Sequence, residues 1–141
     1  MRHVIVAGAQ PFRPSGITKD GQQQLTSSWR DIGGWIADST LPGSAVSGNG
    51  VLAQGAESKA RVTATIPFQI ATGSGGPSQA VRLLVNDAVV ATGSTVGGWS
   101  GTLTATVTVA LDVGDRVTVQ GWSTHGAWVL SGTGTTLRIA K

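Results

Sequence analysis

Hydrophobic and polar residues alternate over two long stretches of this chain. In residues 102–111, four threonines alternate with apolar side chains, and in residues 59–70 the even positions are apolar. A period of two is the spacing of a strand with one buried and one solvated face. Both stretches are therefore predicted strands. Pro67 lies on the polar face of the second one and cannot donate to a ladder, which predicts an edge or a bulge at that point.

Two sequence features predict tight reversals. Asn86 and Asp87 stand between the β-branched runs of residues 81–85 and 89–90, which is typical of a hairpin. Residues 111–115 contain Asp112 and Asp115 on either side of Gly114, which predicts a turn. The chain then continues into a predicted strand whose Val117 and Val119 face inward.

The whole pattern is that of a β protein. Predicted strands recur throughout the chain between glycine-rich turns, from residues 4–9 to residues 135–140, and no stretch has a capped helical stripe. We expect an all-β fold, a jelly-roll-like β-sandwich of about eight to nine antiparallel strands. Residues 1–141 are expected to form this single domain.

Residues 10–24 interrupt the alternation with two prolines and two glycines in the first twelve positions. Proline stiffens an extended chain and glycine breaks a long strand, so this segment is predicted to be an extended arm or loop. Phe12 and Ile17 are its only large apolar side chains before Leu25. We expect these two residues to anchor the arm on a neighbouring protein, outside the core of its own domain.

Composition narrows the possible partners. Charged residues make up 12% of the chain, the net charge is +3, and the arginines and lysines are scattered. Nucleic acid is not an expected partner, because phosphate binding requires clustered cations. No apolar stretch is long enough for a membrane span, so no membrane partner is expected. The absence of cysteine leaves packing and ladder hydrogen bonds to hold the fold and suits synthesis in a reducing cytoplasm.

Titratable residues are few: seven carboxylates and two histidines. Asp112 and Asp115 form the best acidic pair, but their place around a glycine favours a role in the turn. Neither His3 nor His125 has a partner at metal-ligand spacing. We therefore expect no catalytic residue, no metal and no cofactor, and the protein is not expected to be an enzyme.

The five tryptophans are unusual beside two phenylalanines and no tyrosine. Trp29 and Trp35 are expected in the core, as their neighbour Ile36 suggests. Trp99, Trp122 and Trp128 each lie beside or near a glycine, which places them at loops or strand ends. These three are candidates for an interface or for stacking on a sugar, with core packing as an equal alternative.

The segments 81–93, 102–111 and 111–119 together resemble the second half of C1q/TNF-like jelly rolls, in which a strand, an Asn-containing hairpin and a Gly-Asp turn follow in this order. That resemblance implies a trimer. The chain as a whole, including residues 9–18, resembles the small minor tail proteins of actinobacteriophages, which implies a virion component without enzymatic activity.

Three hypotheses for function follow from the sequence. The leading one is a structural virion protein at a phage tail or tail tip, made in the host cytoplasm. It would be a homo-oligomer, expected to be a trimer, that contacts other virion proteins and could engage a host surface glycan. The first alternative is a capsid decoration protein. The second is a carbohydrate-binding β-sandwich module that uses Trp99, Trp122 or Trp128 as its platform.

Overall fold

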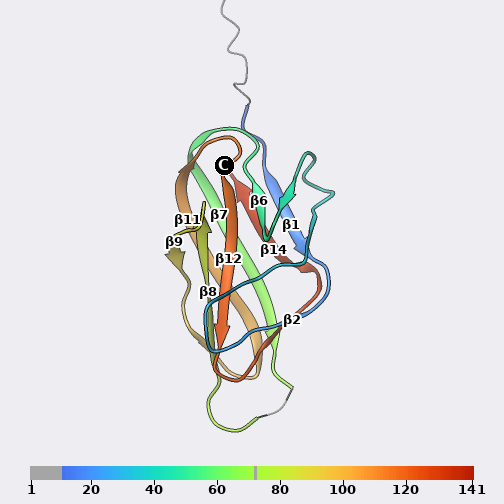
Figure 1. The fold of residues 1–141 in the computed structure, drawn as a ribbon, viewed down its shortest axis with the longest axis vertical. Helices are drawn as coiled ribbons and strands as arrows, with labels where there is room; N and C mark the ends of the chain where they lie inside the picture. Colours follow the sequence, from blue (N-terminus) through green and yellow to red (C-terminus); the bar gives the residue numbers. More distant parts are fainter. Residues whose placement is uncertain (1–10, 72) are drawn as a thin grey trace, which may run out of the picture.

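The computed structural model describes residues 11–71 and 73–141, and it shows two antiparallel sheets packed face to face (Figure 1). The first sheet contains β1 (Ser15–Lys19), β2 (Gln23–Gln24), β4 (Trp35–Ala37), β7 (Glu57–Gln69), β11 (Ser100–Leu111), β13 (Trp128–Val129) and β14 (Gly132–Ala140). The second contains β3 (Arg30–Asp31), β5 (Val46–Ser47), β6 (Gly50–Leu52), β8 (Ser78–Val85), β9 (Ala88–Thr92), β10 (Val96–Gly97) and β12 (Arg116–Ser123). The predicted all-β sandwich is confirmed.

The order of the strands places the open edges. In the first sheet β11 pairs only with β7, and the sheet continues through β14 and β1 to β4 at the opposite edge. In the second sheet β8 pairs with β12 on one side and with β9 and β10 on the other. Strands β9 and β11 therefore lie on the same side of the sandwich, at the left of Figure 1.

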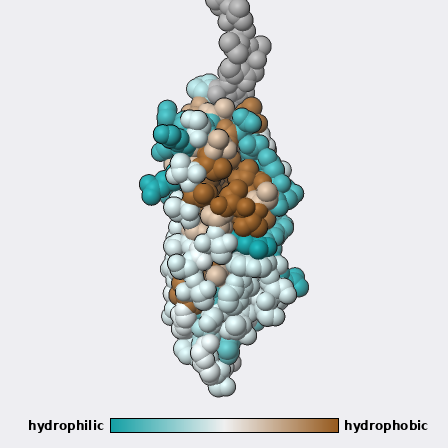
Figure 2. Space-filling view, turned by 90° about the vertical axis from the view of Figure 1, so that its left-hand side faces the viewer, coloured by the Kyte–Doolittle hydropathy of each residue, from teal (hydrophilic) through white to brown (hydrophobic). Residues whose placement is uncertain are grey.

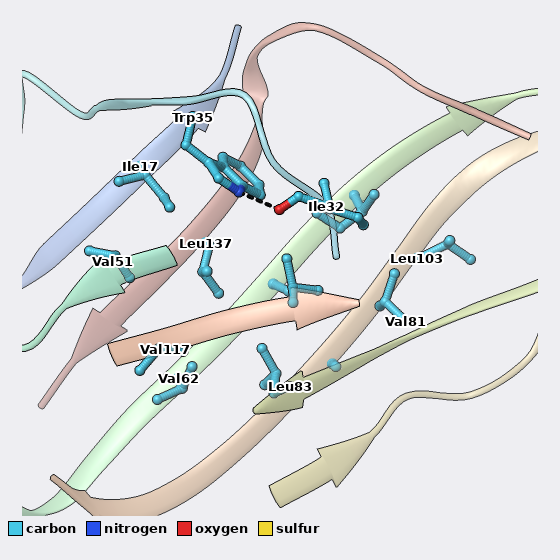
Figure 3. Packing of buried hydrophobic residues seen from close by; sticks show 14 of the residues in the cluster. Ile17, Ile32, Trp35, Val51, Val62, Val81, Leu83, Leu103, Val117 and Leu137 are labelled. Atoms are coloured by element: carbon cyan, nitrogen blue, oxygen red, sulfur yellow. Dashed lines mark hydrogen bonds between the residues drawn. The ribbon is translucent and has the colours of Figure 1, made fainter. Parts of the chain in front are cut away.

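The core follows from the alternation in the sequence. Strands β7 and β11 pair in register over nearly their full length, so that Leu103 lies opposite Ile66, and both are fully buried. The inward side chains of β8 and β12 meet them from the second sheet, as Figure 3 shows for Leu83 and Val117. The threonines between the buried residues of β11 face solvent, as predicted.

The predicted hairpin is confirmed. Asn86 and Asp87 connect β8 to β9 with positive φ values of 48° and 70°. Both central residues of a type I′ turn need this conformation, which asparagine and aspartate tolerate. In the second predicted turn, Asp115 accepts hydrogen bonds from the backbone N–H of Asp112 and from the side chain of Asn86. The carboxylate therefore serves the turn, as expected.

The prediction for residues 10–24 is wrong in its main part. Residues 15–19 form β1, which lies between β14 and β4 inside the first sheet, and all five residues are buried. Ile17 has no exposed surface and belongs to the core (Figure 3), and Phe12 packs partly against it. The segment was misread because a strand covered on both faces has no polar alternation to reveal it.

Two further expectations differ from the structure. The described residues form fourteen strands, more than the eight or nine expected, because seven of them are only two or three residues long. Pro67 lies in a strand with neighbours on both sides, but on one side the partner changes from β14 to β13 around this residue. Residues 4–9, predicted as a first strand, and His3 lie outside the described residues.

Over residues 11–71 and 73–141, no helix has the length and apolar character needed to cross a bilayer.

Candidate functional site

Trp128 lies in a row of side chains that crosses four strands of the first sheet. It pairs with Gln24 of β2 on one side and with Gln69 of β7 on the other, and Gln69 pairs in turn with Ser100 of β11. Residues opposite each other in neighbouring strands have Cβ atoms about 5 Å apart, so these side chains share one surface. The next residue, Val129, is buried in the core, which turns Trp128 outward.

A hollow of about 290 Å³ adjoins this row. Its lining consists of Gln22, Gln69, Ala71, Trp128 and Leu130. Trp128 is 38% exposed, and the amide side chains of Gln22 and Gln69 have no hydrogen-bond partner among the described residues. Trp128 is the first residue of the short strand β13, which agrees with the predicted loop or strand-end position, and its exposure decides against the alternative of core packing. The glutamines beside it were not anticipated.

Trp99 lies at the same end of the sandwich and is also 38% exposed. Its ring meets the edge of His125 at a centroid distance of 5.9 Å. The two imidazole nitrogens of His125 are both engaged, Nε2 with the carbonyl oxygen of Ser74 and Nδ1 with Oγ1 of Thr124, each at 2.8 Å. His125 therefore connects the loops at this end.

Trp122 lies on the outer face of the second sheet and is half-buried. Its ring packs edge-on against Trp29 at 6.2 Å, and the guanidinium of Arg82 lies 4.3 Å from the Trp29 ring centre. The expectation that Trp29 fills the core is wrong, because this cluster holds it half-buried on the outside of the sheet. Trp35 is in the core as expected, and its indole N–H donates to the carbonyl of Ile32 at 2.7 Å (Figure 3).

An apolar surface occupies the edge where β9 and β11 meet. The inward-facing valines of these strands, Val90, Val107 and Val109, pack on the core but stay half-exposed, since no further strand covers them. Val89 beside them is 48% exposed. Figure 2 shows hydrophobic residues gathered on the upper part of this side, with pale, weakly polar residues below. We call the four valines the edge patch.

At the opposite edge of the same sheet, β4 presents Ile36, which is 51% exposed. Ile36 borders a second hollow of about 230 Å³, whose floor includes Thr18 and Arg138. The carboxylate of Asp38 beside it accepts hydrogen bonds from the side chain and backbone of Thr40 and pairs with Arg138 at 3.1 Å. These contacts, led by the Thr40 hydroxyl, lower the pKa of Asp38 below its ordinary value.

The outer face of the first sheet between the two edges is lined with threonine. One row across the sheet runs from Thr18 through Thr136 and Thr65 to Thr104. In the neighbouring row, the hydroxyls of Thr63 and Thr106 lie 2.8 Å apart. Arg138 lies in the row of Thr63, and Arg61 lies opposite Thr108 in the row beyond it, so this face carries hydroxyl groups with two guanidinium groups among them.

The described residues contain no group of three His, Cys, Asp or Glu side chains that could hold a metal ion.

The structure separates the predicted binding residues. It brings Trp99 and Trp128 to one end of the sandwich, places Trp122 on the other sheet, and puts Ile17 in the core with Phe12 against it. Ile36 was missed as an exposed residue. Alternation with a buried Trp35 would have indicated its outward position.

Comparison with known proteins identifies the fold. No protein-family model and no curated protein matches the chain. Among solved structures, the chain is similar to Eiger TNF from S. frugiperda, with a TM-score of 0.62 and 12% identity over 94% of this chain and 93% of that one. It is also similar to murine APRIL, with a TM-score of 0.59 and 15% identity over 93% of this chain and 99% of that one. The fold is therefore a TNF-like jelly roll, and the predicted similarity to C1q/TNF-like jelly rolls is confirmed at the level of the fold.

Proposed function

We propose that this chain is a non-enzymatic structural protein that assembles into a homotrimer as part of a phage tail. The observation that carries the proposal is the pair of unlike surfaces at the two edges of one sheet. The edge patch lies beside β11, and the Ile36 hollow lies beside β4. Two different surfaces, the edge patch on one side and the exposed Ile36 with its hollow on the other, are what a head-to-tail contact between copies of one chain requires.

The physical reason for assembly is the cost of leaving the sandwich open. Valines that face inward yet stay half-exposed keep apolar surface in water, and the uncovered edges of β9 and β11 offer unpaired backbone groups. A second copy that places Ile36 against the edge patch would bury both. Because the contact joins different surfaces, successive copies rotate around an axis, and they form a ring where that rotation closes and a filament where it does not. The trimer is the smallest such ring beyond a pair, and it is the state that the resemblance to C1q/TNF-like proteins implies.

The assignment to a phage tail is supported by the resemblance of the chain to small minor tail proteins of actinobacteriophages. The low charge and the threonine-lined face also suit a surface that packs in an assembly. Gold-labelled antibodies on particles purified from cells that carry the gene should decorate the tail, with few copies per particle. Label spread over the head, with a copy number that follows the capsid lattice, would identify a capsid decoration protein.

The oligomer is tested by light scattering on matched variants. Ile36 and Val113 are equally exposed, at 51% each, but Val113 lies in the turn after β11 and outside both surfaces. We expect a trimer for the native chain and for Val113→Lys, and monomer for Ile36→Lys at the same micromolar concentration. A native chain that scatters as a monomer would contradict the proposal, and so would a trimer that survives Ile36→Lys.

A further inference from the structure

We infer that the hollow beside Trp128 is a binding site for a neutral oligosaccharide. The inference concerns a different surface from the edge patch and does not depend on the oligomer or on the place of the protein in a virion. It rests on three observations: an exposed indole, free amide groups beside it, and the lack of charged side chains in the lining of the hollow.

The first observation is the exposed indole. Trp128 keeps 38% of its surface in solvent although it lies within a sheet, with strands on both sides of its backbone. A sugar ring has one face made of C–H groups, and such a face stacks on an aromatic ring that water hydrates poorly. The neighbouring strands fix the backbone of Trp128, so that little freedom is lost when a ligand binds.

The second observation is the set of polar groups around the indole. Gln69 is the neighbour of Trp128 in the row, Gln22 lines the hollow, and neither amide is used inside the described part of the protein. Each amide both donates and accepts hydrogen bonds. Hydroxyl groups at the rim of a sugar ring also donate and accept, so glutamines beside an aromatic platform complement them. Ser100, at the end of the same row, adds a hydroxyl.

The third observation is the distribution of charge. None of the five residues that line the hollow carries a charge. The charged residues nearest to it along the chain are Lys19 and Asp20, which precede Gln22. A phosphorylated or acidic ligand would find no cation here to pair with. The site is consequently suited to a neutral sugar.

The size of the hollow fits a short glycan end. Its volume of about 290 Å³ is close to the lower limit of about 300 Å³ for small-molecule pockets. It opens to solvent on the outer face of the sheet, so a longer chain could continue past it. An apolar platform with a few convergent polar groups is the general composition of such sites.

The test uses the full chain on an array of neutral and acidic oligosaccharides, followed by tryptophan-fluorescence titration with the best neutral glycan. We expect binding to neutral glycans in the millimolar to micromolar range, and a loss of at least about tenfold in affinity for Trp128→Ala. Trp99→Ala is the matched control, because Trp99 has the same exposed fraction at the same end and does not line the hollow. Its affinity should stay within about twofold of the native value.

Gln69→Leu provides a second variant in case Trp128→Ala disturbs the short strand β13. Leucine keeps the volume at this strand position and removes the amide, so affinity should fall by about threefold to tenfold while the melting temperature holds. No binding to any neutral glycan on the array would overturn the inference. So would equal affinities for the native chain and Trp128→Ala, or a loss with Trp99→Ala alone. Light scattering on the same samples reports the oligomer independently, so that failure of one proposal is distinguishable from failure of the other.

Discussion

The burial of Ile17 in the core makes a specific prediction about stability. Truncation to alanine removes three carbon atoms from a side chain that has no exposed surface. At about 0.8 kcal/mol for each buried methylene, the transfer alone costs about 2.4 kcal/mol. The side chain lies in the centre of the sandwich between the two sheets (Figure 3), where neighbours held in strands cannot fully close the cavity, which raises the expected loss to about 3–4 kcal/mol.

Urea unfolding followed by tryptophan fluorescence measures this loss directly. With an unchanged m-value, the midpoint should fall in proportion to the free energy of unfolding. A chain of this length loses about 2–4 °C in melting temperature for each kcal/mol, so a drop of about 10 °C is expected.

Ile36→Ala is the control, since Ile36 lies on the adjoining strand β4 and is 51% exposed. Its cost should stay under about 1 kcal/mol, and any part that comes from subunit contacts should shrink on dilution. The cost of Ile17→Ala should be the same at every protein concentration. A loss under 1 kcal/mol for Ile17→Ala in the isolated subunit would mean that residues 15–19 do not pack in their own core, and the reasoning would fail.

Three further predictions concern charge and metal. Burial lowers the pKa of Lys19 against the opposing effect of Asp20. The unfolded chain therefore binds the proton of Lys19 more tightly than the folded chain, and the free energy of unfolding should rise with pH up to about 10.5. Lys19→Met should stabilise the protein at neutral pH and abolish that rise. Hydrogen bonds from Thr40 and the charge of Arg138 lower the pKa of Asp38 in the folded protein. The contribution of Asp38 to stability is therefore complete at a pH above its unfolded-state pKa and is lost as the pH falls through its folded-state pKa. Asp38→Asn should lower the free energy of unfolding by about 1 kcal/mol at pH 7 and should reduce the fall of the urea midpoint at acid pH. A chelator should leave the melting temperature unchanged, and a fall of several degrees would reveal a metal site.

The sequence was most informative where one face of a strand is buried and the other is wet. The alternation in β7 and β11 correctly predicted the inward residues, including Ile66 and Leu103, because a period of two is a local property of the chain. The turn at Asn86 and Asp87 was equally local, since these residue types adopt positive φ without help from distant neighbours.

The candidate site was only partly visible in the sequence. For Trp99 and Trp128 the glycine-rich surroundings left an interface role and core packing as equal alternatives, and the structure shows both residues exposed at one end of the sandwich. Trp29 was assigned to the core, yet it lies outside with Trp122 and Arg82. The residues next to Trp29 in the sequence do not indicate whether its loop lies on the inner or the outer face of the sheet.

By itself, the sequence determined the all-β class, the long strands and the hairpin, because each of these depends on neighbouring residues along the chain. Only the tertiary structure decided that residues 15–19 form an inner strand, because this role depends on pairing with β14 and β4 and on the burial of the polar residues Ser15, Thr18 and Lys19. It also decided that Gln22, Gln69 and Trp128 line one hollow. These three residues are far apart along the chain, and what joins them is the pairing of β2, β13 and β7 across the sheet, which no local pattern of residues encodes.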